Sequence, residues 1–95
     1  GSVFKLIADR VTIGRGQQND IAIQDDPRMS RHHAVITITP TSIEITDVSG
    51  HKTMLVNGTE TEKSQMTSGQ TFQLGDTKFQ FKIGDATTEK SMTTT

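Results

Sequence analysis

The chain has 95 residues, of which 31% are hydrophobic and 4% aromatic, and its formal net charge is −1. This length fits one domain, and the balanced charge argues against a broad nucleic-acid surface, which normally requires a basic face. With no cysteine, no signal peptide and no apolar run near the roughly 18 residues of a membrane span, the chain is predicted to be cytoplasmic and to bind neither nucleic acid nor membrane.

The first part of the chain predicts four short strands, over residues 3–7, 10–13, 21–23 and 34–39, where apolar residues are grouped or alternate with polar ones. Residues 1–2, Gly-Ser, are typical of an expression scar. Gly14 and Gly16 flank Arg15 after the second strand, which predicts a tight turn where a ligand can approach the backbone. A loop is expected to begin at Pro27, because the residue before a proline disfavours helix.

The second part predicts two hairpins and a further strand. Residues 43–46 alternate strictly and follow the turn at residues 40–42, so they are expected to pair with residues 34–39. The apolar run 53–56 leads into Asn57-Gly58, the strongest hairpin signal in the chain. Residues 71–74 and 78–83 flank Gly75-Asp76 as a last hairpin. Many short strands separated by turn residues indicate an all-β sandwich or barrel over residues 3–83.

The pattern stops at Gly84. Residues 84–95 are polar, and five of the last nine residues are threonine. This composition predicts a flexible Thr-rich linker or tail, leading to a further domain.

One loop carries an unusual density of hydrogen-bond donors. The run from Arg28 to Ala34 contains two arginines, a serine and two histidines directly before a predicted strand, with no carboxylate among them. Loops held by a rigid sheet are common positions for binding groups, and such a set of donors favours an anion. We therefore expect a local anion site here.

Five motifs follow one another along the chain: Thr12-Ile13-Gly14-Arg15, Asn19-Asp20-Ile21-x-Ile23, Ser30-Arg31-His32-His33-Ala34, Val56-Asn57-Gly58 and Gly69-Gln70-x-Phe72-x-Leu74-Gly75. In this order and spacing they resemble a forkhead-associated (FHA) domain over about residues 3–83. The resemblance implies a β-sandwich of about eleven short strands, with loops at one end that bind phosphothreonine peptides. It also implies a signalling module without cofactor or catalysis, which recruits a phosphorylated partner and regulates an attached domain.

The resemblance also assigns roles to individual residues. Arg15, Ser30 and Arg31 match the positions that hold the phosphate. Asn57 matches the asparagine that binds the peptide main chain, and Arg28 lies where some members select the residue three after the phosphothreonine. The remaining matches shape loops without touching ligand, and they are Gly14, His33 and Gly58. The segment 49–54 departs from the common family pattern, which leaves the shape of the peptide-side loop open.

Other functions fit the sequence less well. A hydrolase set could be imagined from Ser30, His33 and either Asp25 or Asp47, but Ser30 is not in a nucleophile elbow. A metal site is disfavoured because adjacent histidines on a strand point to opposite faces. The main alternative is a phospho-independent interaction or oligomerisation domain of the same fold. The chain is expected to be a monomer unless a phosphorylated threonine of its own Thr-rich segment docks into the site.

Overall fold

A computed structural model describes residues 1–51, 53–84 and 89–94. Every regular element in these ranges is a strand. The strands are β1 (Val3–Lys5), β2 (Arg10–Gly14), β3 (Ile21–Ala22), β4 (Ala34–Ile38), β5 (Ile43–Asp47), β6 (Leu55–Val56), β7 (Thr59–Glu60), β8 (Lys63–Gln65), β9 (Thr71–Leu74), β10 (Thr77–Ile83) and β11 (Lys90–Thr94).

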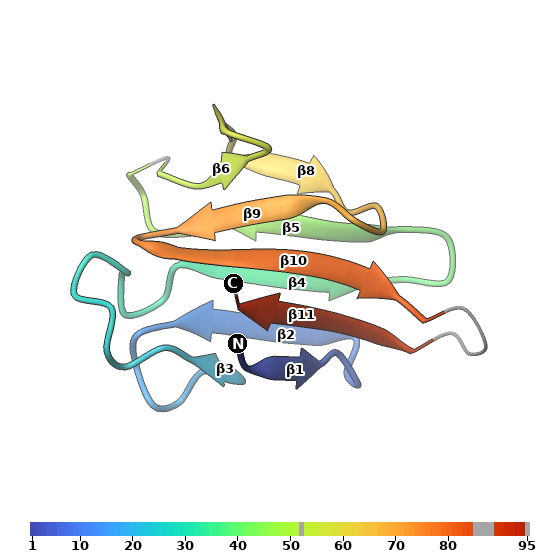
Figure 1. Ribbon diagram of the computed structural model, residues 1–95, viewed down its shortest axis with the longest axis horizontal. Helices are drawn as coiled ribbons and strands as arrows, with labels where there is room; N and C mark the ends of the chain where they lie inside the picture. The colour runs from blue at the N-terminus through green and yellow to red at the C-terminus, as the bar shows by residue number, and fades with distance from the viewer. Residues whose placement is uncertain (52, 85–88, 95) are drawn as a thin grey trace.

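The strands form two facing sheets, which confirms the predicted β-sandwich (Figure 1). One sheet has the order β1-β11-β10-β9-β6-β7, and the other has the order β3-β2-β4-β5-β8. All neighbouring strands are antiparallel except β2 and β3. The segments after β2, before β4, after β5 and between β9 and β10 all lie at the same end of the sandwich (Figure 1).

The core lies between the two sheets, because alternate residues of each strand point inward. Its fully buried members include Ile13, Ile36, Ile45, Phe72, Phe79, Phe81 and Met92. Buried aromatic and aliphatic side chains of this kind each contribute about 1.5–3 kcal/mol relative to exposure. This packing gives the loops at the sandwich end a rigid support.

Both predicted hairpins that flank polar turns are confirmed. β4 pairs with β5 over five residues, and β9 pairs with β10 around Gly75-Asp76. Asn57 and Gly58 form the turn between β6 and β7, with φ angles of 50° and 88°. These left-handed values are those of a type I′ turn, for which Asn-Gly is the preferred pair.

The prediction of a flexible linker is wrong for Lys90–Thr94, which form β11 between β1 and β10. Met92 is fully buried and lies opposite both Phe4 and Phe81. One inward-facing methionine among polar residues is enough to make this segment a strand, because β1 and β10 both supply hydrogen bonds to its backbone. Thr93 and Thr94 are therefore held in the sheet, and docking of either into a binding site would require β11 to leave it. Thr87, Thr88 and Thr95 lie outside the described residues.

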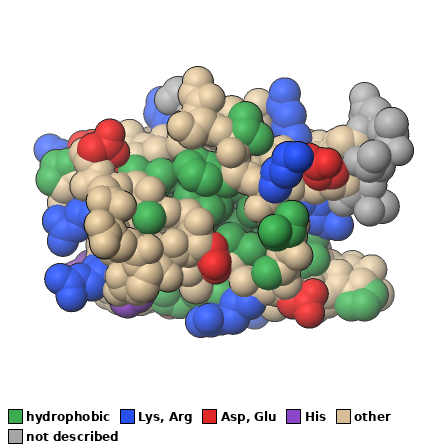
Figure 2. All heavy atoms as spheres, turned by 90° about the horizontal axis from the view of Figure 1, so that it is seen from below, with side chains coloured by type: hydrophobic (Ala, Val, Ile, Leu, Met, Phe, Trp, Pro, Cys, Tyr) green, Lys and Arg blue, Asp and Glu red, His purple; other side chains and the backbone are tan. Residues whose placement is uncertain are grey.

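The sandwich is open along the side where β1 and β3 are the edge strands. Figure 2 shows hydrophobic side chains at the surface of this face. A hollow there is lined by Val3, Phe4, Ile7, Val11 and Ile21, and Ile7 is 89% exposed. The core thus reaches the surface between these two edges.

Candidate functional site

Backbone hydrogen bonds clamp the loop after β2 against the donor-rich loop before β4. Arg15 N donates to Ser30 O at 3.0 Å, and Gly16 N donates to Arg31 O at 3.1 Å. His33 N then donates to Ile13 O at 2.9 Å, where β4 begins to pair with β2. These three hydrogen bonds, which we call the clamp, hold the two loops in a fixed register.

Gly14 and Asn19 explain why the two loops approach so closely. A Cβ added to Gly14 would lie 2.1 Å from Arg31 O, so no side chain fits at this position. Asn19 is buried, and its Nδ2 donates to both Gly16 O (2.8 Å) and Arg31 O (2.7 Å). One amide group therefore holds both loops together.

The clamp brings Arg15 and Arg31 to a single polar hollow of about 400 Å³. Its other lining residues are Gly16, Gln17, Gln18 and Gln24. Both arginines are exposed, and within the described residues neither forms an ion pair. No carboxylate is among the residues that line the hollow. Two unpaired guanidinium groups in one hollow provide planar donor forks for an anion.

Ser30 is half-buried and its backbone O accepts the hydrogen bond from Arg15 N, but Ser30 is not among the residues that line the hollow. Its position is fixed by His33, whose Nδ1 accepts a hydrogen bond from Ser30 N at 3.1 Å. His33 Nε2 lies 3.1 Å from Thr53 Oγ1, and since Nδ1 accepts, Nε2 carries the proton of the neutral ring. Burial lowers the pKa of His33, against the nearby charges of Asp47 and Asp26, so the ring is neutral near pH 7.

This geometry excludes a hydrolase set made of Ser30, His33 and Asp47. The ring of His33 bonds to the backbone of Ser30 rather than to its hydroxyl. Asp47 directs its carboxylate to the backbone N–H groups of Ser49 (2.8 Å), Thr53 (2.9 Å) and Met54 (3.0 Å). Asp47 therefore folds the segment after β5 instead of orienting a catalytic base.

The pKa of Asp47 lies below its ordinary value. Burial alone would raise the pKa, but hydrogen bonds from Ser49 and Met54 and the field of His33 outweigh burial. Val48 N also donates to His33 O at 2.9 Å, which places the segment after β5 beside the donor-rich loop. A third loop thus joins the same end of the sandwich.

Arg28 is the first residue of the donor-rich loop and lies outside the residues that line the hollow. Its Nε is 3.5 Å from Asp76 Oδ2 in the β9–β10 turn, and its side chain is 78% exposed. Asp26 anchors this region, because its Oδ2 accepts from Asp76 N (2.9 Å) and Thr77 Oγ1 (2.7 Å). Burial would raise the pKa of Asp26, but the hydrogen bonds from Thr77, Arg28, Asp76 and Met29 lower it overall.

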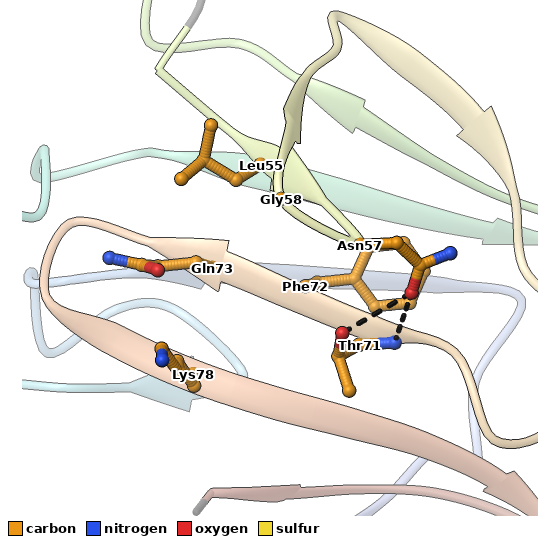
Figure 3. Close-up of a pocket in the computed structure, with 7 residues that line it drawn as sticks. All are labelled: Leu55, Asn57, Gly58, Thr71, Phe72, Gln73 and Lys78. Carbon is orange, nitrogen blue, oxygen red and sulfur yellow. Dashed lines mark hydrogen bonds between the residues drawn. The ribbon is translucent and has the colours of Figure 1, made fainter.

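Asn57 does not join Arg15, Ser30 and Arg31. It lines a separate hollow of about 260 Å³ with Leu55, Gly58, Thr71, Phe72, Gln73 and Lys78 (Figure 3). Its Oδ1 accepts from Thr71 N and Thr71 Oγ1, both at 3.2 Å. Because β9 runs from Thr71 toward the Gly75 turn, Asn57 lies about 13 Å along the sheet from the end that carries Arg28 and Asp76. The structure gives Asn57 the role of stabilising its own turn.

Comparisons with known families and solved structures show the family to which the chain belongs. The model of a family described as "Inner membrane component of T3SS, cytoplasmic domain" (Yop-YscD_cpl) matches residues 1–85. The structure also superposes on the FHA-2 domain of an ABC transporter from Mycobacterium tuberculosis, with 30% identity and a TM-score of 0.74, covering 95% of this chain and 77% of that domain. The chain belongs to this FHA-type family.

Two further structures are similar to this FHA domain. EmbR from M. tuberculosis, solved in complex with a low-affinity phosphopeptide, is 32% identical with a TM-score of 0.80, and the match covers 88% of this chain and 22% of EmbR. The FHA domain of CT664 from Chlamydia trachomatis is 29% identical with a TM-score of 0.71, and the match covers 79% of this chain and 78% of that one. A search of curated protein sequences found no significant match.

Family membership makes the chain a protein-interaction module and not an enzyme. Within residues 1–51, 53–84 and 89–94, no group of three or more histidine, aspartate or glutamate residues is arranged to hold a metal ion. The same ranges contain no helix long and apolar enough to cross a membrane.

Sequence reasoning missed two polar residues that build this FHA site, Asn19 and Asp47. In the sequence, Asn19 stands out only as part of a motif, and Asp47 only as a hypothetical catalytic acid. A local signal for Asp47 was present, because Asp47-x-Ser49 is typical of a turn in which the aspartate caps the backbone two residues on. The contacts of Asn19 with Arg31 O span twelve residues, and no local pattern predicts them.

Proposed function

We propose that this FHA domain is a phosphothreonine-dependent peptide-binding module, in which Arg15, Ser30 and Arg31 hold the phosphate. The observation that carries the proposal is the backbone clamp, which brings Arg15 and Arg31 to one hollow without a carboxylate. Phosphothreonine carries about −1.5 to −2 charges near pH 7 and three acceptor oxygens, which match two guanidinium forks and a hydroxyl. The phosphopeptide bound by the similar protein EmbR supports the same ligand class.

Peptide selectivity is proposed for Arg28, which lies outside the hollow on the same loop as Ser30 and Arg31. Its guanidinium is exposed and only loosely paired with Asp76, so an acidic peptide residue can compete for it. We do not assign Asn57 to the peptide main chain, because its amide oxygen is occupied by Thr71 and its hollow is a different one.

The experiment is a screen of phosphothreonine peptides and their unphosphorylated counterparts, followed by calorimetry on the best binder. Arg15→Ala should weaken binding at least tenfold, since a charge-assisted hydrogen bond is worth about 1.5–3 kcal/mol. Ser30→Ala and Arg31→Ala should also weaken it. Arg10→Ala is the matched control, because Arg10 is an exposed arginine on β2 that does not line the hollow. Equal affinity of Arg15→Ala and Arg10→Ala for the phosphopeptide would refute the assignment.

A second candidate is a phospho-independent contact within a larger assembly. The family description names a component of a secretion apparatus, and the exposed apolar face at β1 and β3 offers a surface for such contact (Figure 2). A partner bound equally well with and without phosphate would favour this function. We place the domain in the cytoplasm, since the family description is of a cytoplasmic domain. We further propose that the recruited partner regulates a domain attached to this one, as the matched segment makes up 22% of EmbR.

A further inference from the structure

The amide of Asn19 has only one possible orientation. Its Nδ2 donates to the two carbonyl groups of Gly16 and Arg31, so its Oδ1 must point the other way. That oxygen lies 3.3 Å from His32 Nδ1. Since Oδ1 accepts hydrogen bonds and cannot donate, His32 Nδ1 must carry a proton in every state that keeps the clamp.

This constraint determines the rest of the His32 ring. A neutral ring has one N–H, so His32 Nε2 is an acceptor as long as the ring is neutral. Gln18 Nε2 lies 3.3 Å from His32 Nε2 and is its donor. Asn19, His32 and Gln18 thus form a hydrogen-bonded chain of side chains, in which the orientation of each group determines which atom of the next one donates.

The chain orients the amide of Gln18 within the hollow. Because Gln18 Nε2 is directed to His32, Gln18 Oε1 faces Gly16, where it lies 2.7 Å from the place that a Gly16 Cβ would take. Gln18 and Gly16 both line the hollow with Arg15 and Arg31. A carbonyl oxygen at this position repels a dianion, and an N–H group would bind it.

We propose that Gln18 is a further ligand-binding residue and that protonation of His32 positions it. This inference rests on the proposed function, since it concerns the same hollow. When His32 is protonated, Nε2 becomes a donor, and the amide of Gln18 turns by about 180° so that Oε1 accepts from it. Gln18 Nε2 then points into the hollow and donates to the phosphate. Binding of the dianion therefore takes up a proton at His32.

The charges around His32 favour this coupling. Arg31 and His33 lie on its own loop, Arg15 and Asp20 lie on the loop after β2, and His51 on the segment after β5 acts on His33. Asp20 is engaged by Thr12 N (2.9 Å) and Thr12 Oγ1 (3.2 Å). A dianion bound in the neighbouring hollow favours a positive charge on the ring.

The size of the effect follows from proton linkage. Where the ring is mostly neutral, each unit of pH decrease raises its protonated fraction by up to about tenfold. If binding selects the protonated ring, lowering the pH from 8.0 to 6.5 should strengthen binding about tenfold relative to a protein with no titrating group at this position. The phosphate itself loses affinity below about pH 6, as it takes up its second proton. The wild-type affinity should therefore be highest near pH 6 to 6.5.

The test compares wild type, His32→Gln and Gln18→Ala, using the tightest phosphothreonine peptide from the screen above. Dissociation constants are measured by calorimetry at pH 8.0, 7.5, 7.0 and 6.5, and the ratio to His32→Gln cancels the protonation of the phosphate. Wild type should gain about tenfold over His32→Gln across this range. Gln18→Ala should lose most of that gain, although it keeps the imidazole. NMR of the His32 ring should show a titration midpoint at higher pH in the peptide-bound wild type than in the free protein.

Two results would overturn the inference while leaving the proposed function intact. One is Arg15-dependent binding whose pH profile is the same in wild type and His32→Gln. The other is a Gln18→Ala profile that equals that of wild type, which would make His32 a purely electrostatic group. If the phosphopeptide does not bind at any pH, both the proposed function and this inference fail.

Discussion

Replacement of Gly14 by alanine should damage the candidate site and the fold together. The new Cβ would lie 2.1 Å from Arg31 O, so this carbonyl must recede by about 0.9 Å to reach even the 3.0 Å limit of real contacts. This movement stretches the hydrogen bonds from Gly16 N (3.1 Å) and from Asn19 Nδ2 (2.7 Å) that end on the same oxygen. Overpacking costs about 1–3 kcal/mol and an unsatisfied buried amide about 1–3 kcal/mol, so we expect a loss of about 3 kcal/mol.

Thermal unfolding and phosphopeptide calorimetry measure the two effects. For a domain of this size a loss of about 3 kcal/mol lowers Tm by about 12 °C or more. Affinity should fall at least tenfold, because Arg31 moves relative to Arg15. Gly58→Ala is the matched control, with open space around the new Cβ and a φ of 88°. It should cost about 1 kcal/mol through backbone strain and leave affinity unchanged. A Gly14→Ala protein with wild-type Tm and wild-type affinity would refute the reasoning about the clamp.

Three further predictions concern other parts of the molecule. Met92→Ala should destabilise the domain by about 2–5 kcal/mol in urea unfolding, because Met92 is fully buried in β11, and a wild-type midpoint would restore the view of this segment as a linker. The free energy of unfolding should fall in two steps as the pH decreases. The first step lies below about pH 6.5, because His33 binds a proton more readily in the unfolded chain than in the folded one. The second lies below about pH 4, because folding lowers the pKa values of Asp26 and Asp47. Urea unfolding from pH 8 to pH 3 checks this, and an unchanged midpoint across the range would contradict it. Asn57→Ala should lower Tm by a few degrees, through loss of the left-handed turn residue, and leave phosphopeptide affinity unchanged; a tenfold loss of affinity would return Asn57 to the peptide site.

The sequence predicts the architecture well where apolar residues alternate. The β4–β5 and β9–β10 hairpins follow from residues such as Ile36, Ile45 and Phe79, which are fully buried in the structure. Short polar strands cannot be predicted from the alternation of apolar residues. β7, β8 and β11 are strands because a neighbour pairs with their backbone, and their own side chains carry almost no apolar period.

The candidate site is predictable to the extent that its parts are local motifs. Arg15, Ser30 and Arg31 belong to two motifs, and the clamp that joins these motifs is made by main-chain groups that have no sequence signature. Asn57 is ambiguous in the sequence, since an Asn-Gly pair fits both a turn and a ligand contact. Only the pairing of β6 with β9, which brings Asn57 to Thr71, decides in favour of the turn. Long-range backbone contacts are thus the information that the sequence pattern lacks.

The placement of β11 has a consequence for how the chain reaches its final form. Val3 lies opposite Thr93, so β1 has no partner in its sheet until β11, the last strand of the domain, has been synthesised. During synthesis on the ribosome, β2 to β10 can assemble before β11 has emerged. The apolar side chains of β1 stay exposed to chaperones during that time. Closure of such a distant pair also costs loop entropy before any contact is gained, which makes it a natural last and slow event in folding.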